Sequence, residues 1–347
     1  MPELKLYTIA QLRDWVLHNS EVEGLSEMII SRTRAYALVN NPYVSDEDPV
    51  VAAIFVDGEN AAYVTAFPEL IDEKRYWWFS ALWCNPKYQG NGYGLIVIGS
   101  LAEIYGYTCC LDRWGAKETV EIFTYLGLKT TYTPRYLLGV KIDRTTTKGK
   151  FVHFIRSMQR NLHRILEHPI RNETYTLRYL PIIDDDTYTF IVSNQETAYI
   201  LHTQEYMNWV LTHPFNISAP LIERVANQMP FADSEKPSIQ LFAVQVLDGS
   251  QIIGFYLMKS NADALHILYL YYDDSVKYQV FASIRDHIRR MHIAQCVTEN
   301  KHLADYLQEQ LYFPKCVIQN ISFSYSESMH QPLAGHVQYG DGDCFTA

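Results

Sequence analysis

Residues 82–94 read Leu82-Trp83-Cys84-Asn85-Pro86-Lys87-Tyr88-Gln89-Gly90-Asn91-Gly92-Tyr93-Gly94. The glycines at alternate positions leave the backbone without Cβ atoms, so successive N–H groups can turn toward one anion and approach it closely. The almost wholly apolar segment 92–105 predicts a helix, and its N-terminus adds a positive dipole end at the same place. This stretch therefore predicts a loop that binds a pyrophosphate with backbone amides.

Two better-known phosphate loops do not fit this pattern. A dinucleotide fingerprint needs its third glycine one place later, where this chain has Leu95, and a P-loop needs a Gly-Lys-Ser/Thr sequence that is absent. The remaining alternative is a plain turn marked by glycines. It requires the preceding strand, Pro86 and Gln89 to coincide with the glycines by accident, so we favour the pyrophosphate loop.

The same stretch resembles motif A of the GNAT superfamily of N-acetyltransferases, which binds the pyrophosphate of coenzyme A. The family pattern is Val-x-Pro-x-x-Gln/Arg-Gly-x-Gly-x-Gly/Ala; every polar and glycine position matches, and Cys84 replaces the usual Val. The resemblance implies acetyl-CoA as co-substrate and two groups of cofactor-binding residues. The main chain that pairs with the pantetheine arm comes from Leu82, Trp83 and Cys84. The pyrophosphate is held by Gln89, Gly90, Asn91, Gly92, Tyr93 and Gly94.

The order of the predicted elements in residues 1–143 agrees with the GNAT fold. An Asp57-Gly58 pair predicts a hairpin turn between two of the strands. Apolar spacing predicts strand 5–9, helices 10–18 and 25–34, strands 50–56, 61–67 and 75–84, helix 92–105, strand 107–112, helix 115–126, and closing strands 129–132 and 135–142.

The second half repeats this order without the glycine loop. The two Asp-Gly turns, at Asp57 and Asp248, are 191 residues apart, whereas the ends of the last helices, Leu128 and Phe313, are 185 apart. The six missing residues equal the length of the segment 89–94. Asp273-Asp274-Ser275 stands in its place, and its negative charges repel a pyrophosphate. We expect a degenerate domain that binds no coenzyme A and instead shapes the acceptor site.

The predicted fold class is therefore α/β (α+β), with two tandem GNAT-like domains, each a mixed, mostly antiparallel sheet flanked by helices. A chain of 347 residues with 48% hydrophobic content can bury two ordinary cores. We place the coenzyme A domain at 1–144, a linker helix at 145–168, and the degenerate domain with its C-terminal tail at 169–347. The linker pattern is basic and amphipathic; we favour a solvated interdomain helix over an RNA or membrane surface.

Composition excludes several other function classes. The net charge of −10 opposes nucleic-acid binding. The chain has no apolar run of about 18 residues and no N-terminal signal segment, which predicts a soluble cytoplasmic protein with no membrane partner. Six cysteines without a Cys-x-x-Cys pair predict neither zinc nor disulfides, and we expect no metal. We interpret Asp184-Asp185-Asp186 as a solvated loop and the scattered histidines as non-ligands.

The general acid is where the chain departs from the family. The family's Tyr-x-x-x-Gly-Phe segment supplies a tyrosine, but Phe123 stands at that position and is expected near the coenzyme A sulfur. Tyr125, the weak alternative, lies about 200° further around the helix. Ala116 replaces a common asparagine. The strand 75–84 carries no carboxylate to act as base, and we expect the C-terminal tail from Asp341 onward to be disordered rather than folded into the site.

These features favour an N-acyltransferase, most simply an acetyl-CoA-dependent N-acetyltransferase that transfers its acyl group directly to an amine in a ternary complex. The expected acceptor is a small-molecule or peptide amine, in particular an amino-acid-like one. A coenzyme A-binding or regulatory protein without activity is an alternative, because the tyrosine and asparagine are missing. A tRNA-dependent aminoacyl transferase is a further alternative, which the glycine loop and the acidic balance oppose.

Overall fold

The computed structural model of the chain describes residues 1–113, 115–139, 175–194, 200–213, 239–261, 264–291, 293–311, 316–326, 329 and 337–342. The chain packs as two compact units. The first takes Met1–Thr133, Glu196–Ile239 and Ile321–Ala347, and the second takes Pro134–Gln195 and Gln240–Asn320. The predicted linker helix 145–168 lies outside the described residues, so the domain boundaries at 144 and 168 stay predictions.

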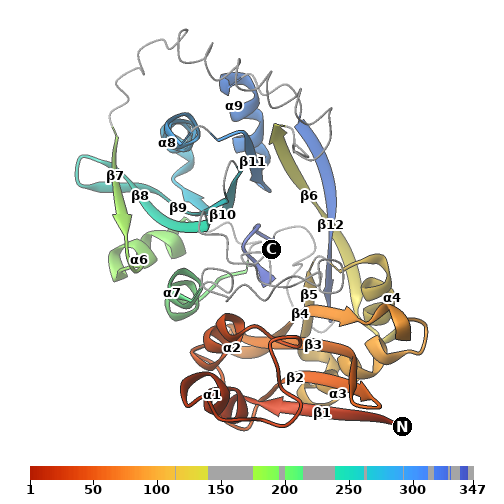
Figure 1. Cartoon of the computed structure of the whole chain (residues 1–347). Coiled ribbons are helices and arrows are strands. Elements are labelled where there is room, and N and C mark those ends of the chain that lie inside the picture. Colours follow the sequence, from red (N-terminus) through yellow and green to blue (C-terminus); the bar gives the residue numbers. More distant parts are fainter. Residues whose placement is uncertain are drawn as a thin grey trace. The chain divides into compact units, whose positions relative to one another are not determined.

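The first unit is built on a sheet with the strand order β1-β2-β3-β4-β5-β12 (Figure 1). The pairs among β1 to β4 are antiparallel, β4 and β5 are parallel, and β12 is antiparallel to β5. The strands span β1 (Pro2–Thr8), β2 (Pro49–Val56), β3 (Glu59–Ile71), β4 (Lys74–Cys84), β5 (Cys110–Arg113) and β12 (Cys316–Tyr325). The predicted Asp-Gly hairpin joins β2 to β3, with positive φ angles at Asp57 and Gly58.

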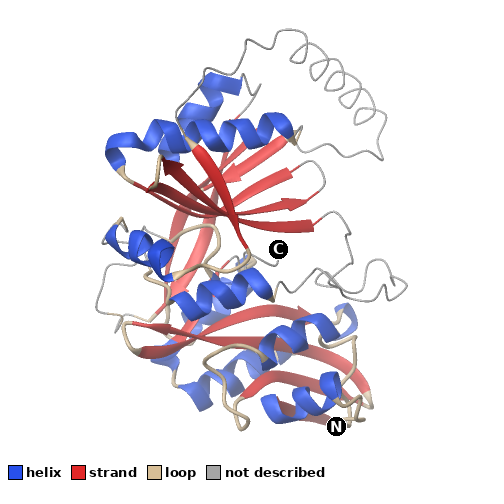
Figure 2. Cartoon of the chain, turned by 90° about the vertical axis from the view of Figure 1, so that its left-hand side faces the viewer, coloured by secondary structure: helices blue, strands red, loops and turns tan. Residues whose placement is uncertain are grey.

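Helices cover both faces of this sheet (Figure 2). On one face α3 packs against β2, β3 and β4, and Tyr105 of α3 stacks on Trp77 of β4. On the other face the Arg34 side chain of α2 reaches Ser80 of β4, and the Trp209 ring of α7 packs against Phe67 of β3. The helices of this unit are α1 (Ile9–Leu17), α2 (Arg32–Val39), α3 (Tyr93–Tyr105), α4 (Lys117–Tyr125) and α7 (Gln204–Thr212).

The second unit repeats the same topology, with the strand order β7-β8-β9-β10-β11-β6. Its only parallel pair among the described strands is β10–β11, which corresponds to β4–β5. The strands are β6 (Lys129–Gly139), β7 (Thr176–Leu180), β8 (Ile239–Asp248), β9 (Gln251–Asn261), β10 (Ala264–Tyr272) and β11 (Gln295–Thr298); the helices are α6 (Asp185–Ser193), α8 (Lys277–Arg290) and α9 (Lys301–Leu311). The tandem architecture predicted from the repeat is therefore confirmed.

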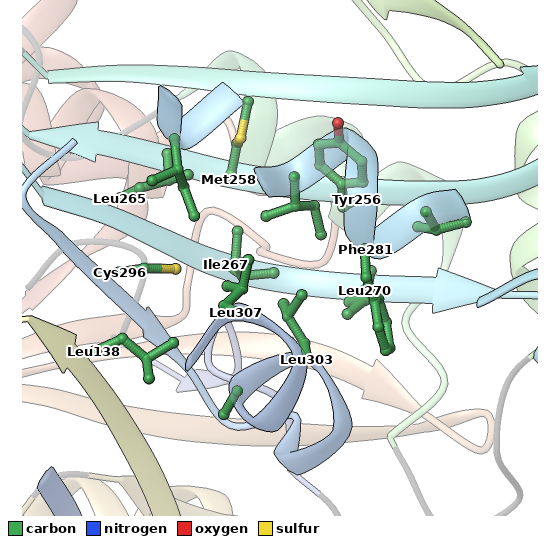
Figure 3. Packing of buried hydrophobic residues seen from close by; sticks show 14 of the residues in the cluster. Leu138, Tyr256, Met258, Leu265, Ile267, Leu270, Phe281, Cys296, Leu303 and Leu307 are labelled. Carbon is green, nitrogen blue, oxygen red and sulfur yellow. The ribbon is translucent and has the colours of Figure 1, made fainter. Parts of the chain in front are cut away.

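The core of the second unit lies between its sheet and the helices α8 and α9 (Figure 3). Leu265 and Ile267 of β10 and Leu303 and Leu307 of α9 belong to this core, and each of these side chains is at most 2% exposed. The three- and four-residue spacing of the apolar positions in α9 is the pattern that predicted this helix from sequence. The second unit therefore has a hydrophobic core of its own.

Each unit takes its sixth strand from the other half of the chain. Residues 321–325 of β12 belong to the first unit, where Phe323 pairs with Arg113 of β5. Residues 134–139 of β6 belong to the second unit, where Gly139 pairs with Gln295 of β11. The sequence predicts two closing strands at 129–132 and 135–142; the structure instead forms one strand, which runs through Pro134 to Gly139, and residues 140–142 lie outside the described residues.

Two further boundaries differ from those predicted. The helix expected at 25–34 is wrong: α2 begins at Arg32, because the Ser31 side chain caps it by accepting from the Arg34 N–H. The strand expected at 107–112 begins only at Cys110, since a 3₁₀ turn, η2 (Tyr107–Cys109), precedes it. Apolar spacing alone does not mark where a polar cap starts a helix.

Candidate active site

The two parallel strands β4 and β5 separate partway along β4. They pair at Trp77–Cys110, Trp78–Leu111 and Phe79–Asp112, and β5 ends at Arg113. In the described part of the chain no strand pairs with residues 80–84 on the β5 side, whereas β3 pairs with the opposite edge. We call this point the β4–β5 fork. Its free main-chain N–H and C=O groups can bind the extended chain of a ligand as a further strand would.

A β-bulge lies directly at the fork. Thr65 pairs with Ser80 and Tyr63 pairs with Trp83, so two residues of β4, Ala81 and Leu82, oppose one residue of β3. Ala81 has a φ of 53°, which is uncommon for a residue with a side chain. Such bulges redirect main-chain groups and are frequent beside active sites. Here the bulge turns peptide groups of β4 out of the regular ladder at the place where β5 has left it.

The glycine loop follows β4 and leads into α3. After the 3₁₀ turn η1 (Pro86–Tyr88), residues 89–92 are exposed, and Gly90 and Gly92 have φ angles of 87° and 77°. A Cβ atom at either glycine would meet nothing within 4 Å, so the space above the loop is open. Gly92 is the N-cap of α3 and makes no side-chain cap hydrogen bond. The first N–H groups of α3 are therefore not capped by a side chain, which suits a bound phosphate.

Gly94 brings the start of α3 close to the end of β4. A Cβ atom at Gly94 would lie 3.1 Å from the Cys84 sulfur and 3.5 Å from Ile122 of α4. Burial raises the pKa of the Cys84 thiol, and the Gly94 N–H, which donates to it, opposes this shift. The predicted cofactor residues at the end of β4 and in the loop up to Tyr93 are half-buried or exposed, whereas Gly94 is buried. The half-buried end of β4 contributes Leu82, Trp83 and Cys84, and the loop contributes Gln89, Gly90, Asn91, Gly92, Tyr93 and Gly94.

The helix α4 presents Phe123 to the underside of the fork. Its ring is 1% exposed and packs edge-on against Phe79 with 5.5 Å between ring centroids. Phe79 is the last residue of β4 that pairs with β5, so Phe123 lies under the fork. Tyr125, by contrast, is 78% exposed at the last position of α4. The geometry keeps the two aromatic side chains apart, as the 100° rotation per helical residue requires.

If the chain transfers acyl groups as the sequence resemblance implies, replacing Tyr125 by Phe should leave that transfer unchanged. A general acid contributes about 10²- to 10⁴-fold, so its loss would be obvious in steady-state turnover at saturating coenzyme A thioester. A collapse of kcat with intact cofactor affinity would show that Tyr125 reaches the leaving thiolate.

The opposite face of β4 carries polar groups that sequence analysis missed. Arg34 of α2 is buried, and its guanidinium donates to the Ser80 hydroxyl at 2.8 Å. The Thr65 hydroxyl lies 2.8 Å from the same oxygen. The sequence of α2 does not predict that Arg34 is buried, because a single arginine in a short helix usually faces solvent.

A second polar group on this face joins three segments that are far apart in sequence. His202 lies between the carboxylates of Glu69 and Asp341, and all three side chains are at most 1% exposed. The prediction of a disordered tail is thus wrong for Asp341 and Gly342, because buried ionic contacts hold them. Only Glu69 could have indicated this cluster from sequence, because it is a charged residue within the apolar run of β3.

The Asp184–Asp186 segment is also not the loop we expected. Asp184 is the N-cap of α6, and its carboxylate accepts from the Thr187 N–H at 2.9 Å. The hydrogen bond from the Thr187 hydroxyl lowers the pKa of Asp184 most strongly. Asp185 and Asp186 fill the first helical turn, where the helix dipole favours acidic residues. No group of His, Cys, Asp and Glu in the described residues is arranged to hold a metal ion.

The second unit keeps the register shift of the fork but has a short turn in place of the glycine loop. The strand β10 has a register shift between Ile267 and Tyr269, as β4 does beside its own parallel partner. In place of the glycine loop, the Asp273 carboxylate accepts from the N–H and the hydroxyl of Ser275 in the turn η3 (Asp274–Val276). The Ser275 N–H and hydroxyl groups therefore already donate to a carboxylate of the chain itself. That coenzyme A does not bind there stays a prediction.

Comparison with known proteins supports the fold. No protein-family model matches the chain, and no curated protein matches it by sequence. Among solved structures, a candidate acetyltransferase of Pyrococcus horikoshii is 10% identical over 98% of this chain and 96% of its own, with a TM-score of 0.52. A conserved protein of unknown function from Enterococcus faecalis is 10% identical over 93% of this chain and 72% of its own, with a TM-score of 0.51.

The N-myristoyltransferase of Saccharomyces cerevisiae, with bound myristoyl-CoA, is also similar. It is 9% identical over 93% of this chain and 82% of its own, with a TM-score of 0.50. The predicted resemblance is confirmed at the level of the fold: the chain has two tandem units of the same mixed α/β topology and shares its fold with these structures. In the described part of the chain, no helix combines the length and the apolar character needed to cross a bilayer.

Proposed function

We propose that this protein is an acyl-CoA-dependent N-acyltransferase, with its coenzyme A site in the first unit. The observation that carries the proposal is the coincidence of three features at one place. All three lie within residues 80–94: the free edge of β4, the bulge at Ala81, and the glycine loop before α3, which has no side-chain cap. Together they offer main-chain partners for an extended thioester arm and amide donors for a pyrophosphate.

We propose acetyl as the transferred group. The Phe79 and Phe123 rings fill the space under the fork, and Phe123 is fully buried. This packing favours a short acyl group over a long one, because a long acyl chain would have to displace both rings. The acceptor we propose is a small-molecule or peptide amine, with an amino-acid-like compound as the first class to test; neither nucleic acid nor membrane is a proposed partner.

The residue requirements of such a reaction are light. Positioning the amine against the thioester supplies much of the rate, and main-chain N–H groups at the bulged part of β4 can donate to the developing oxyanion. The neutral amine nitrogen forms its bond to the thioester carbon, the C–S bond breaks to release the thiolate, and the surplus proton of the amine passes to solvent water. With Phe123 at the family's tyrosine position, solvent or another hydroxyl has to protonate this thiolate, which has a pKa of about 8.5 in solution.

The second candidate function is a coenzyme A-binding protein without catalysis. The observation that favours it is the combination of Phe123 and Ala116 at positions where the family carries a tyrosine and an asparagine. A tRNA-dependent aminoacyl transferase is disfavoured by the net charge of −10.

Calorimetry with acetyl-CoA, followed by thioester consumption with a panel of amines, tests these functions in turn. We expect one acetyl-CoA bound per chain and consumption with at least one amine. Two acetyl-CoA molecules bound per chain would contradict the prediction that coenzyme A does not bind in the second unit. Binding without any consumption would favour the non-catalytic alternative, and no binding at all would overturn both functions.

A further inference from the structure

A buried cluster of charged side chains holds the C-terminal segment 337–342 in the first unit. The Nδ1 atom of His202 contacts the carboxylate of Glu69, and its Nε2 atom lies 2.8 Å from Oδ1 of Asp341. Glu69 belongs to β3, His202 precedes α7, and Asp341 lies near the C-terminus. One histidine thus connects three segments that are separated by more than a hundred residues.

Further contacts complete the cluster and balance its charge. The Trp78 indole N–H donates to the second oxygen of Glu69. Arg113 lies 3.7 Å from Oδ2 of Asp341 and donates to the carbonyl of Gln338. The same Oδ2 accepts from the Gln338 N–H at 2.7 Å. Because unpaired charges are costly to bury, this arrangement fixes the segment 337–342 in one place.

That place is the β4–β5 fork. A Cβ atom on Gly342 would lie 2.9 Å from the Trp78 ring and 3.2 Å from Cβ of Arg113. Trp78 is on β4, one residue before the last paired position, and Arg113 is the last residue of β5. The backbone at Gly342 therefore passes over the point where the two strands separate.

The segment lies on the face of the sheet opposite α3 and α4. Alternation along β4 puts Trp78 and Ser80 on one face and Trp77 and Phe79 on the other. Tyr105 of α3 and Phe123 of α4 cover the second face. We therefore assign the amine acceptor to the face that Trp78, Ser80 and the C-terminal segment share.

We propose that Glu69, His202 and Asp341 are positioning residues for acyl transfer, which hold the segment 337–342 as the wall of the acceptor site at the fork. This inference rests on the proposed function. The wall acts on the orientation of the amine and not on the glycine loop, which lies at the far end of β4. A misplacement of about 1 Å can cost about a hundredfold in rate, so a released wall should be visible in the acceptor kinetics.

The central test compares Asp341→Asn with Asp305→Asn. The control removes a carboxylate that pairs with Lys301 on the surface of α9, where both side chains are more than half exposed. Hydrogen exchange of the segment 337–342, acetyl-CoA affinity by calorimetry, and kcat and KM for the acceptor are measured for each. We expect Asp341→Asn to speed exchange of the segment and lower kcat/KM for the acceptor by about tenfold or more, with acetyl-CoA affinity unchanged. Asp305→Asn should change none of these, and Asp341→Glu should restore part of the loss.

A second variant moves the wall without touching a charge. Gly342 has a φ of 66°, and Gly342→Ala would press a methyl group on the Trp78 ring. Gly342→Ala should raise the acceptor KM and so lower kcat/KM, as Asp341→Asn does. This second variant keeps the inference testable if Asp341→Asn folds poorly.

Two outcomes would overturn the inference while acyl transfer stands. One is a wild-type segment that exchanges as fast as an unfolded peptide. The other is a released segment in Asp341→Asn with unchanged kcat and KM. A protected segment in a wild-type protein that transfers no acyl group to any amine would instead overturn the proposed function, and the positioning role with it.

Discussion

Gly92→Val should weaken acetyl-CoA binding by about tenfold to a hundredfold, measured by calorimetry. Gly92 has a φ of 77°, and a β-branched residue in this left-handed region costs about 1–3 kcal/mol. The chain can relieve that strain only by moving the loop, and tenfold in affinity corresponds to about 1.4 kcal/mol. The added side chain also extends into the open space above the loop, where we place the pyrophosphate.

Gly99→Ala is the matched control for this experiment. Gly99 lies in the same helix, α3, with no positive φ, and a Cβ atom there meets nothing within 4 Å. It should bind acetyl-CoA as the wild type does and gain up to about 1 kcal/mol of stability, because alanine favours a helix interior. Undiminished affinity in Gly92→Val would remove the glycine loop from the proposed cofactor site.

His202→Gln should destabilise the protein by about 3–5 kcal/mol at pH 6, measured by urea unfolding. The substitution leaves the carboxylates of Glu69 and Asp341 facing each other in the core without the cation between them. Removing one partner of a buried ionic group costs this much because the remaining charge is uncompensated. The Tyr206 ring, which stacks on His202, loses its partner as well.

The stability that His202→Gln loses relative to wild type should become smaller as the pH rises. Burial alone would lower the pKa of His202, but the carboxylates of Glu69 and Asp341 outweigh it and raise the pKa to about 10. A raised pKa in the folded state contributes stability that is complete below about 6.5, the unfolded value, and is lost toward pH 10. The difference between wild type and variant should therefore be largest near pH 6 and smaller at pH 9.5.

His18→Gln serves as the control for both measurements. His18 also pairs with a carboxylate, that of Asp14, but both side chains are more than half exposed. An exposed pair contributes little, so this variant should stay within about 1 kcal/mol of wild type at every pH. A stability difference for His202→Gln that stays constant or grows between pH 6 and 9.5 would contradict a charged histidine in the cluster.

The sequence by itself determined the features that depend on near neighbours in the chain. The glycine spacing at 90, 92 and 94 predicted the exposed loop ahead of α3, because left-handed φ angles require the absence of a Cβ atom. The Asp57-Gly58 pair predicted the hairpin for the same reason. The missing six residues in the second half predicted a repeat without the loop, and the structure has the same strand order in both units.

Only the tertiary structure decided which distant segments complete the first unit. The strand β12 joins β5, and His202 and Asp341 join Glu69, although more than a hundred residues separate the partners. An isolated histidine or aspartate in a loop has no periodicity that marks it as buried; it becomes buried only when an opposite charge meets it in the folded core. For this reason the tail predicted to be disordered is ordered at Asp341, and the polar face of the fork could be recognised only once the sheet had brought its strands together.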